Sequence, residues 1–391
     1  MSCIYLDYNA TTPVDSRVLD AMLPFLKEKF GNASSKNHPY GWAANEVVEL
    51  ARERIAKLLG ATPKEIIFTS GATEANNLAI LGLFGLKPEG AKRQIITSAV
   101  EHHAVLDTAH ELARRGFEVT VLRPDSAGRT NAEQVREAIT ARTLLVSIMA
   151  ANNEIGTLNP ISEIGAVCKN AGVLFHTDGA QAVGKIPMDV DRMGIDLMAL
   201  SGHKFYAPKG VGALYVRTRT PRTRLEPITF GGGQERGLRS GTLNVPSIVG
   251  LGEAARIARE DLSTESARIA ALRDRLLQGI TSRIDGVQRN GSVDFSLPGT
   301  LSLSFESVDG AALIVSLPDL ALSTGSACTT GSAEPSYVLK AIGVPDRLAF
   351  STVRFSLGRH TTEAEVDRAA SRVAEVVRKL RGQLATVGGA A

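Results

Sequence analysis

The sequence predicts an α/β protein: a large domain with a mainly parallel sheet, followed by a smaller α+β domain. From residue 66 to residue 216, short apolar runs alternate with amphipathic segments, a pattern typical of a parallel sheet covered by helices on both faces. After Val249 this alternation stops, and a long charged amphipathic segment precedes shorter elements. The 391 residues, 43% of them hydrophobic, are enough to form one large core and one smaller core.

The large domain is expected to begin with two helices and then to repeat strand, loop and helix. Residues 4–13 read as extended, with a turn at 9–13, and the first helices are predicted at 16–30 and 40–59. Thr62-Pro-Lys-Glu65 matches a capping box with only a short turn behind it. The strands of the repeating part are predicted at residues 66–70, 93–97, 117–122, 144–149, 173–176, 197–200 and 212–216, and its helices from residue 71 and at 105–115, 131–140 and 161–171.

The second domain is predicted from the change of pattern after Val249. Its helices are expected at 251–284, 310–317, 335–342 and from the capping box at Thr362 to about residue 384, and its strands at 300–305 and 350–355. We therefore place the large domain at 13–258. The small domain comprises 259–391, with residues 1–12 packed on it.

Composition excludes several classes of function. A net charge of +3 without a basic block gives no reason to expect binding of nucleic acid. Three cysteines without a CxxC spacing argue against a disulfide framework and an intrinsic metal site, and favour a reducing cytoplasm. The first residues lack the features of a signal peptide, and no apolar run is long enough to span a bilayer.

Two strand ends carry the residues expected to do chemistry. The strand at 197–200 ends in Ser201-Gly-His-Lys204, and the preceding strand ends in Asp178. An amine that attacks an aldehyde and a carboxylate that keeps a pyridine nitrogen protonated are the two groups that pyridoxal phosphate requires. The alternatives are a solvated lysine at Lys204 and a helix N-cap at Asp178.

Three further segments could complete a site for an anionic cofactor. Ser70-Gly-Ala-Thr73 lies between a strand and a helix, where backbone N–H groups and the Thr73 hydroxyl would bind a phosphate. One imidazole of the pair His102-His103 could lie on a planar ring and also transfer protons, which makes His102 a candidate catalytic residue, although two surface histidines are the commoner interpretation. The glycine-rich basic loop at 231–242 reads as an anion-binding loop, in this subunit or a neighbouring one, or as a surface connection.

Residues of the small domain could supply a nucleophile and a group that binds the substrate. Cys328 lies in a small, polar, glycine-bearing run at about 323–333 that is expected to be exposed, whereas Cys168 reads as a core cysteine. Arg354 could bind a carboxylate through two hydrogen bonds, and its alternative is a surface arginine on an edge strand. Asn153 follows another strand and could donate to a cofactor or substrate oxygen, or form a turn.

Together these segments resemble the NifS/IscS-like cysteine desulfurases, within the class V aminotransferase family of fold-type I pyridoxal-phosphate enzymes. The resemblance runs from residue 5 to residue 354, and SGHK with GSAC is its most specific part. It implies a seven-stranded sheet and a homodimer. The matching segments are Tyr5-Leu-Asp-Tyr-Asn-Ala-Thr-Thr-Pro13, Gly71-Ala-Thr-Glu-Ala-Asn77, Glu101-His102, Asn152-Asn-Glu-Ile-Gly156, Asp178-Gly-Ala-Gln181, Ser201-Gly-His-Lys204, Arg239-Ser-Gly-Thr242 and Gly325-Ser-Ala-Cys328.

The resemblance also implies a role for each matching residue. Lys204 would hold the cofactor and move protons, Asp178 would pair with the pyridine nitrogen, His102 would stack on the ring, and Gln181 would bond the phenolic oxygen. The phosphate would be bound by Ala72, Thr73, Ser201 and His203, with Thr242 from the other subunit. The substrate carboxylate would be bound by Asn153 and Arg354, and Asn153 and Gly202 would also contact the cofactor.

The implied reaction converts L-cysteine to L-alanine. The thiolate of Cys328 attacks the substrate sulfur and becomes a persulfide, which a sulfur-acceptor or iron–sulfur scaffold protein would receive; Cys328 could also be a transient cluster ligand. The alternatives are a selenocysteine lyase, another class V aminotransferase, and a non-catalytic assembly subunit. The sequence leaves open the physiological acceptor, the preference for sulfur or selenium, and the turnover.

Overall fold

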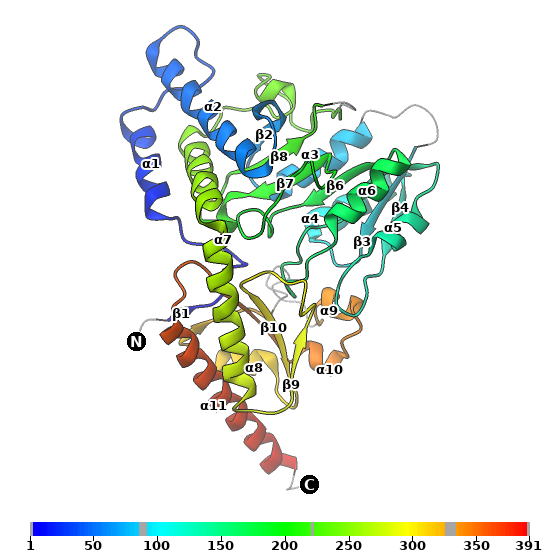
Figure 1. The fold of residues 1–391 in the computed structure, drawn as a ribbon, viewed down its shortest axis with the longest axis vertical. Helices are drawn as coiled ribbons and strands as arrows, with labels where there is room; N and C mark the ends of the chain where they lie inside the picture. Colours follow the sequence, from blue (N-terminus) through cyan, green and yellow to red (C-terminus); the bar gives the residue numbers. More distant parts are fainter. Residues whose placement is uncertain (1–2, 86–91, 220–222, 325–333, 389–391) are drawn as a thin grey trace.

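The chain forms a large sheet covered by helices and a smaller sheet below it, and one long helix runs through both parts (Figure 1). A computed structural model describes residues 3–85, 92–219, 223–324 and 334–388. The long helix, α7, spans Val245–Thr281. In Figure 1 it descends from the large sheet past β10 toward α11.

The large sheet has seven strands in the order β2-β8-β7-β6-β5-β3-β4. All neighbouring strands are parallel except where β8 pairs antiparallel with β2 and β7. This confirms the expected mainly parallel, seven-stranded sheet. The strands are β2 (Ile66–Thr69), β3 (Gln94–Ser98), β4 (Glu118–Leu122), β5 (Thr143–Ser147), β6 (Leu174–Asp178), β7 (Leu197–Ser201) and β8 (Gly212–Val216).

Both faces of this sheet carry an apolar core, and successive residues of a strand contribute to opposite faces. The edge strand β4 is the exception, because none of its residues is buried. Ile66 and Phe68 join one apolar core, and Ile67 between them joins another. The first core includes residues of α1 (Ser16–Lys27), α2 (Pro39–Leu59), α5 (Ala132–Ala138), α6 (Ile161–Ala171) and α7, and the second includes residues of α3 (Ala72–Gly85) and α4 (His103–Arg114).

The smaller sheet is antiparallel and has the order β12-β10-β9. The N-terminal segment belongs to this part: Ile4 pairs with Leu320, and Asp7 bridges to Ser356. The remaining elements are β1 (Ile4–Tyr5), β9 (Val287–Asn290), β10 (Thr300–Phe305), α8 (Gly310–Val315), β11 (Leu320–Ala321), α9 (Tyr337–Ala341), α10 (Asp346–Ala349), β12 (Thr352–Ser356) and α11 (Glu363–Gly388).

Helix α7 begins at Val245, earlier than the predicted residue 251. The side chain of Asn244 accepts a hydrogen bond from the Ser247 N–H and caps the helix there. Up to Ala258 the helix contributes to the core of the large sheet, and from Leu272 it contributes to the core of the small one. The boundary at residue 258 stays a prediction.

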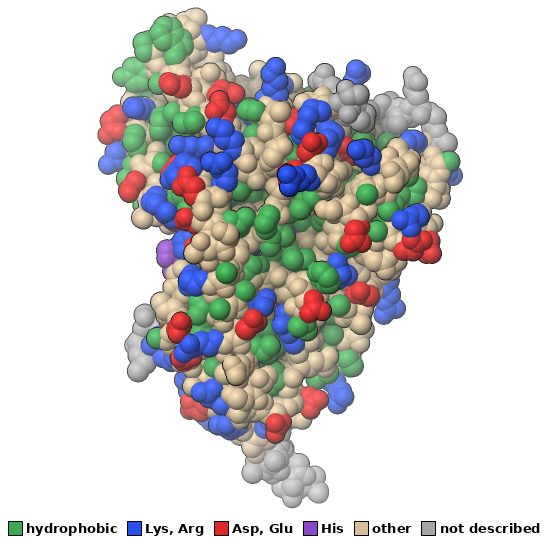
Figure 2. Space-filling view, in the orientation of Figure 1, with side chains coloured by type: hydrophobic (Ala, Val, Ile, Leu, Met, Phe, Trp, Pro, Cys, Tyr) green, Lys and Arg blue, Asp and Glu red, His purple; other side chains and the backbone are tan. Residues whose placement is uncertain are grey.

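On the face shown in Figure 2, side chains of both charges are mixed; apolar side chains lie toward the middle of this face and also gather over α1, α2 and the segment that joins them. In the described parts of the chain, no helix combines the length and apolarity needed to cross a membrane. The exposed apolar side chains of this region are Leu19, Leu23, Leu26, Phe30, Tyr40, Trp42 and Leu50.

Candidate active site

A cavity of about 590 Å³ opens where β2, β6 and β7 end, between the large sheet and the N-terminal segment. The carboxyl ends of parallel strands are the usual ligand site of an open α/β sheet, and this volume suits a cofactor-sized molecule. The sequence-predicted residues that line it are Ala72, Thr73, His102, Asn153, Asp178, Gln181, Ser201, His203, Lys204 and Arg354.

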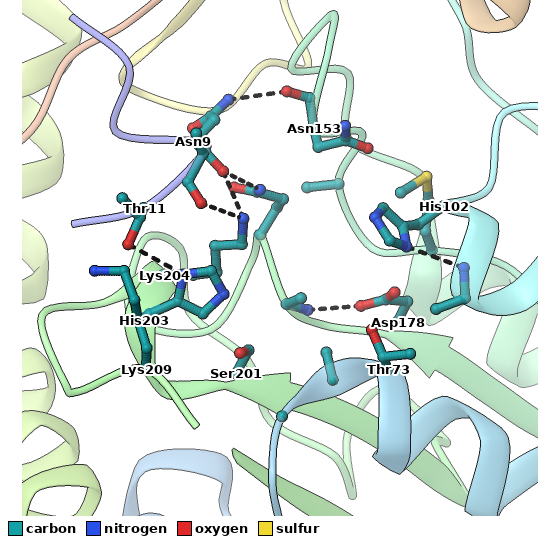
Figure 3. A pocket seen from close by; sticks show the side chains of 18 of the residues that line it. Asn9, Thr11, Thr73, His102, Asn153, Asp178, Ser201, His203, Lys204 and Lys209 are labelled. Carbon is teal, nitrogen blue, oxygen red and sulfur yellow. Dashed lines mark hydrogen bonds between the residues drawn. The ribbon is translucent and has the colours of Figure 1, made fainter. Parts of the chain in front are cut away.

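Lys204 enters this cavity from the end of β7. The strand stops at Ser201, and a single 3₁₀ turn, η2 (Gly202–Lys204), carries the lysine into the cavity. Its Nζ donates hydrogen bonds to the carbonyl oxygens of Asn9 at 2.7 Å and Ala10 at 2.8 Å (Figure 3). The N-terminal segment therefore holds the amine in place, and Lys204 is not a solvated surface lysine.

Asp178 is the last residue of β6, the strand next to β7. Its side chain is buried and accepts hydrogen bonds from the Asn76 amide at 2.8 Å and from the Ala180 N–H at 2.9 Å. The second bond is a turn contact, and no described helix begins directly after Asp178, so the alternative interpretation as a helix N-cap is wrong. Because Asp178 also lines the cavity, its carboxylate is oriented toward any ligand there.

His102 lies opposite Lys204 across the cavity in Figure 3. Its Nδ1 accepts the N–H of Ala104 at 3.0 Å and so caps α4, which leaves the ring proton of the neutral form on Nε2. Burial lowers its pKa; the Asp178 charge opposes this change and the Lys204 charge adds to it. A neutral, partly buried ring is suited to lie against a planar ligand.

The other end of the cavity is suited to an anion. Ala72 and Thr73 form the first turn of α3, whose free N–H groups favour negative charge. The Nδ1 of His203 lies 3.2 Å from the Thr11 hydroxyl. Burial and the charges of Lys204 and Lys209 lower the pKa of His203 to about 4, so this ring is neutral near pH 7.

Asn153 and Arg354 form the wall that faces the small sheet. Arg354 is only 3% exposed; its guanidinium donates to the Asn153 carbonyl at 2.9 Å and to Asp7 at 2.7 Å. Its Nε and the Asn153 Oδ1 are buried without a hydrogen-bond partner among the described residues. The interpretation of Arg354 as a surface arginine is therefore wrong. Asn152, by contrast, stabilises the turn by accepting the N–H groups of Glu154 and Ile155.

Two predicted site residues, Gly202 and Thr242, do not line the cavity. The N–H of Gly202 donates to the Val211 carbonyl at 2.9 Å. Thr242 is exposed on the loop at 231–242, which Arg239 ties to Glu74 of α3 at 2.7 Å. Cys328 lies outside the described residues.

Several residues that contribute polar groups to this constellation have no role predicted from the sequence: Asn9, Ala10 (through its carbonyl oxygen), Thr11, Asn76, Lys185 and Lys209. Asn9, Ala10 and Thr11 lie in the matching segment at 5–13 and Asn76 in that at 71–77, but neither the patterns nor the resemblance gave them a role. Every residue type has a backbone carbonyl oxygen, so the sequence does not indicate which of them bind a side chain. The contacts of Asn9 also join positions more than 100 residues apart. Only the folded chain could identify them.

The chain is similar to known proteins over nearly its whole length. Residues 4–369 match the family described as Aminotransferase class-V. A protein named Cysteine desulfurase IscS from Anaeromyxobacter dehalogenans (strain 2CP-C) is 54% identical over 378 residues, or 97% of this chain and 93% of that protein. A solved structure of a NifS-like protein has a TM-score of 0.89 at 40% identity, covering 96% of this chain and 99% of the other. A structure described as SspA in complex with cysteine has a TM-score of 0.82 at 42% identity, covering 92% and 100%.

Proposed function

The chain belongs to the class V aminotransferase family, and from that premise we propose that it is a pyridoxal-phosphate-dependent cysteine desulfurase. It converts L-cysteine to L-alanine and carries the sulfur away as a persulfide on Cys328. The observation that carries the proposal is the placement of the Lys204 amine and the Asp178 carboxylate on neighbouring strand ends of one cavity. The similarity to a structure described with cysteine supports the choice of substrate.

The residues of the cavity fit pyridoxal phosphate. The first turn of α3 suits its phosphate, the oriented carboxylate of Asp178 suits its pyridine nitrogen, and the amine of Lys204 suits its aldehyde. When bound, the cofactor supplies an electron-withdrawing ring for an attached amino acid. The residues that would hold it are Ala72, Thr73, His102, Asn153, Asp178, Gln181, Ser201, Gly202, His203 and Lys204, with Thr242 from a second copy of the chain.

The substrate carboxylate is bound by Arg354 and Asn153. The Arg354 guanidinium is fixed by Asp7 and by the Asn153 carbonyl, so its planar donors are already oriented before substrate enters. A buried Nε without a partner among the described residues is a donor that a substrate oxygen could use after a small rotation. Binding of the carboxylate by these two residues would place the Cα of cysteine in the same cavity as the Lys204 amine.

Lys204 is the base that removes the Cα proton and later returns a proton to the alanine carbon. The carbonyl oxygens of Asn9 and Ala10 accept hydrogen bonds from its Nζ. They hold the amine whenever it is not covalently engaged, and they stabilise it once it has taken a proton. His102, neutral because burial lowers its pKa, offers an Nε2 proton on the opposite side.

Cys328 receives the sulfur. Its thiolate attacks the sulfur of L-cysteine, the carbon–sulfur bond breaks with its electron pair going to carbon, and that carbon takes a proton to become the methyl group of L-alanine. L-cysteine and a thiol therefore give L-alanine and a persulfide, with no outside oxidant. Ser323, which precedes Cys328 in the sequence, pairs through its backbone with Arg354, and the hydroxyl of Ser336, which follows it, donates a hydrogen bond to Glu154 at 2.5 Å.

A homodimer and a protein sulfur acceptor complete the proposal. The exposed apolar side chains over α1 and α2 form a surface that a second copy could cover, and Thr242 is exposed on the tethered loop at 231–242. Cys3 and Cys168 are free thiols, in keeping with a reducing cytoplasm. The resemblance around Cys328 favours an iron–sulfur scaffold protein as the acceptor.

The test compares variants of the two central residues. L-alanine release from L-cysteine and the mass of the Cys328 peptide are measured for wild type, Lys204→Ala and Cys328→Ala. We expect Lys204→Ala to lose alanine formation by about 10³-fold, and Cys328→Ala to keep the bound cofactor but form no persulfide. Cys3→Ala, which alters an exposed thiol outside the site, is the matched control and should behave as wild type. Equal rates for Cys328→Ala and wild type under limiting reductant would refute the role of Cys328.

A further inference from the structure

A second lysine, Lys185, lies behind the wall of the cavity and shares its partners with Lys204. The Nζ of Lys185 donates to the Gln181 Oε1 at 2.6 Å and to the Asn9 Oδ1 at 3.1 Å. The carbonyl oxygen of the same Asn9 accepts from the Lys204 Nζ at 2.7 Å and from the Gln181 Nε2 at 3.0 Å. Two amines and two amide side chains therefore form one network.

This network determines which way the Gln181 amide faces. Gln181 is 5% exposed and lines the cavity. With its oxygen bound to Lys185 and one N–H bound to the Asn9 carbonyl, its second N–H is the donor left for a ligand. Without Lys185 the amide oxygen would be buried with no donor, which favours rotation of the side chain and loss of that orientation.

The surroundings of Lys185 make its ammonium responsive to negative charge in the cavity. Both of its acceptors are neutral amide oxygens. Burial, together with the charges of Lys204 and Arg354, lowers its pKa to about 7. An anionic oxygen bonded to Gln181 would favour the charged form of Lys185. The hydrogen bond from Lys185 to Gln181 and the hydrogen bond from Gln181 to that oxygen would then strengthen each other. The other titratable groups around it are His203, Tyr8, Tyr206, and Glu265, which is paired with Arg359.

We propose that Lys185 is a positioning residue of the cofactor site: it holds the Gln181 amide so that an N–H is presented to the phenolic oxygen of the cofactor. This rests on the proposed function. By stabilising that oxygen as an anion, Lys185 acting through Gln181 makes the covalent linkage at Lys204 hold its proton less tightly. The linkage then changes colour at a lower pH than it would without Lys185.

The experiment is a pH titration of the visible absorption of the holoenzyme. We expect Lys185→Met to raise the midpoint of the colour change by about one pH unit, and Lys185→Arg, which keeps a cationic donor, to restore most of the wild-type value. Lys57→Met, an exposed lysine on α2, should leave the midpoint unchanged. Lys185→Ala is measured in the same way and carries the test if Lys185→Met does not fold.

A double-mutant cycle separates action through Gln181 from a general effect of charge. In the Gln181→Ala background, Lys185→Met should have no further effect on the midpoint. An unchanged midpoint in Lys185→Met, or full additivity in the double variant, overturns the proposal. The proposed function fails separately: in that case wild type would not form a coloured linkage that Lys204→Ala loses.

Discussion

The buried ion pair between Arg52 and Glu235 should be among the most costly contacts in the protein to break. Two hydrogen bonds of 2.8 Å join the guanidinium to the carboxylate, which also accepts the Phe68 N–H at 2.7 Å. The two side chains are 5% and 2% exposed. Arg52 also pairs with Glu49 at 3.1 Å, but that side chain is 49% exposed. Glu235→Gln keeps the shape but removes the buried counter-charge of Arg52, so we expect the free energy of unfolding to fall by about 3 kcal/mol.

The assay is urea unfolding of the cofactor-free protein, followed by circular dichroism at one protein concentration. Asp367→Asn is the matched control, because Arg275 also joins Asp367 through two bonds of 2.7 Å, but with side chains 46% and 52% exposed. That variant should lose less than about 1 kcal/mol. If Glu235→Gln lowers the free energy of unfolding no more than Asp367→Asn does, burial does not determine how much an ion pair contributes to stability, and the reasoning is wrong.

Two further perturbations test the core and the phosphate end of the site. Burial lowers the pKa of His176 from its ordinary 6.5 to about 3. As the pH falls, the unfolded chain therefore takes up a proton on this residue before the folded chain does. The stability that the neutral, buried His176 contributes is complete above pH 6.5 and is lost as the pH falls toward 3. From pH 6.5 to pH 5, wild type should therefore lose about 2 kcal/mol more than His176→Gln in urea unfolding, and parallel losses would contradict this. Gly212→Ala would place a Cβ against the Leu200 carbonyl and 2.7 Å from the Gly71 Cα, so the turn before α3 must move. We expect the free energy of unfolding to fall by about 1–3 kcal/mol and the retention of pyridoxal phosphate to weaken roughly tenfold. Gly382→Ala, whose Cβ would meet no described atom within 4 Å, should do neither.

The sequence alone was sufficient for the features that depend on neighbouring residues. The alternation of apolar runs with amphipathic segments predicted the mainly parallel sheet, because a buried strand needs apolar side chains along its own length. The capping boxes at Thr62 and Thr362 form as predicted, because their partners lie three residues away. The positions of Lys204 and Asp178 at strand ends followed from the same local patterns.

Only the tertiary structure decided how distant segments complete the cavity. The sheet order brings the ends of β6 and β7 together, and the reversal of β8 left no local sign. The contacts of Asn9 with Gln181, Lys185 and Lys204 join positions more than 170 residues apart, partly through a backbone oxygen that every residue type carries. The sequence therefore determined which chemical groups the chain contains and which local helices, strands and turns carry them. Packing determined which of those groups meet, because the free energy of bringing them together comes from the two cores and not from the groups themselves.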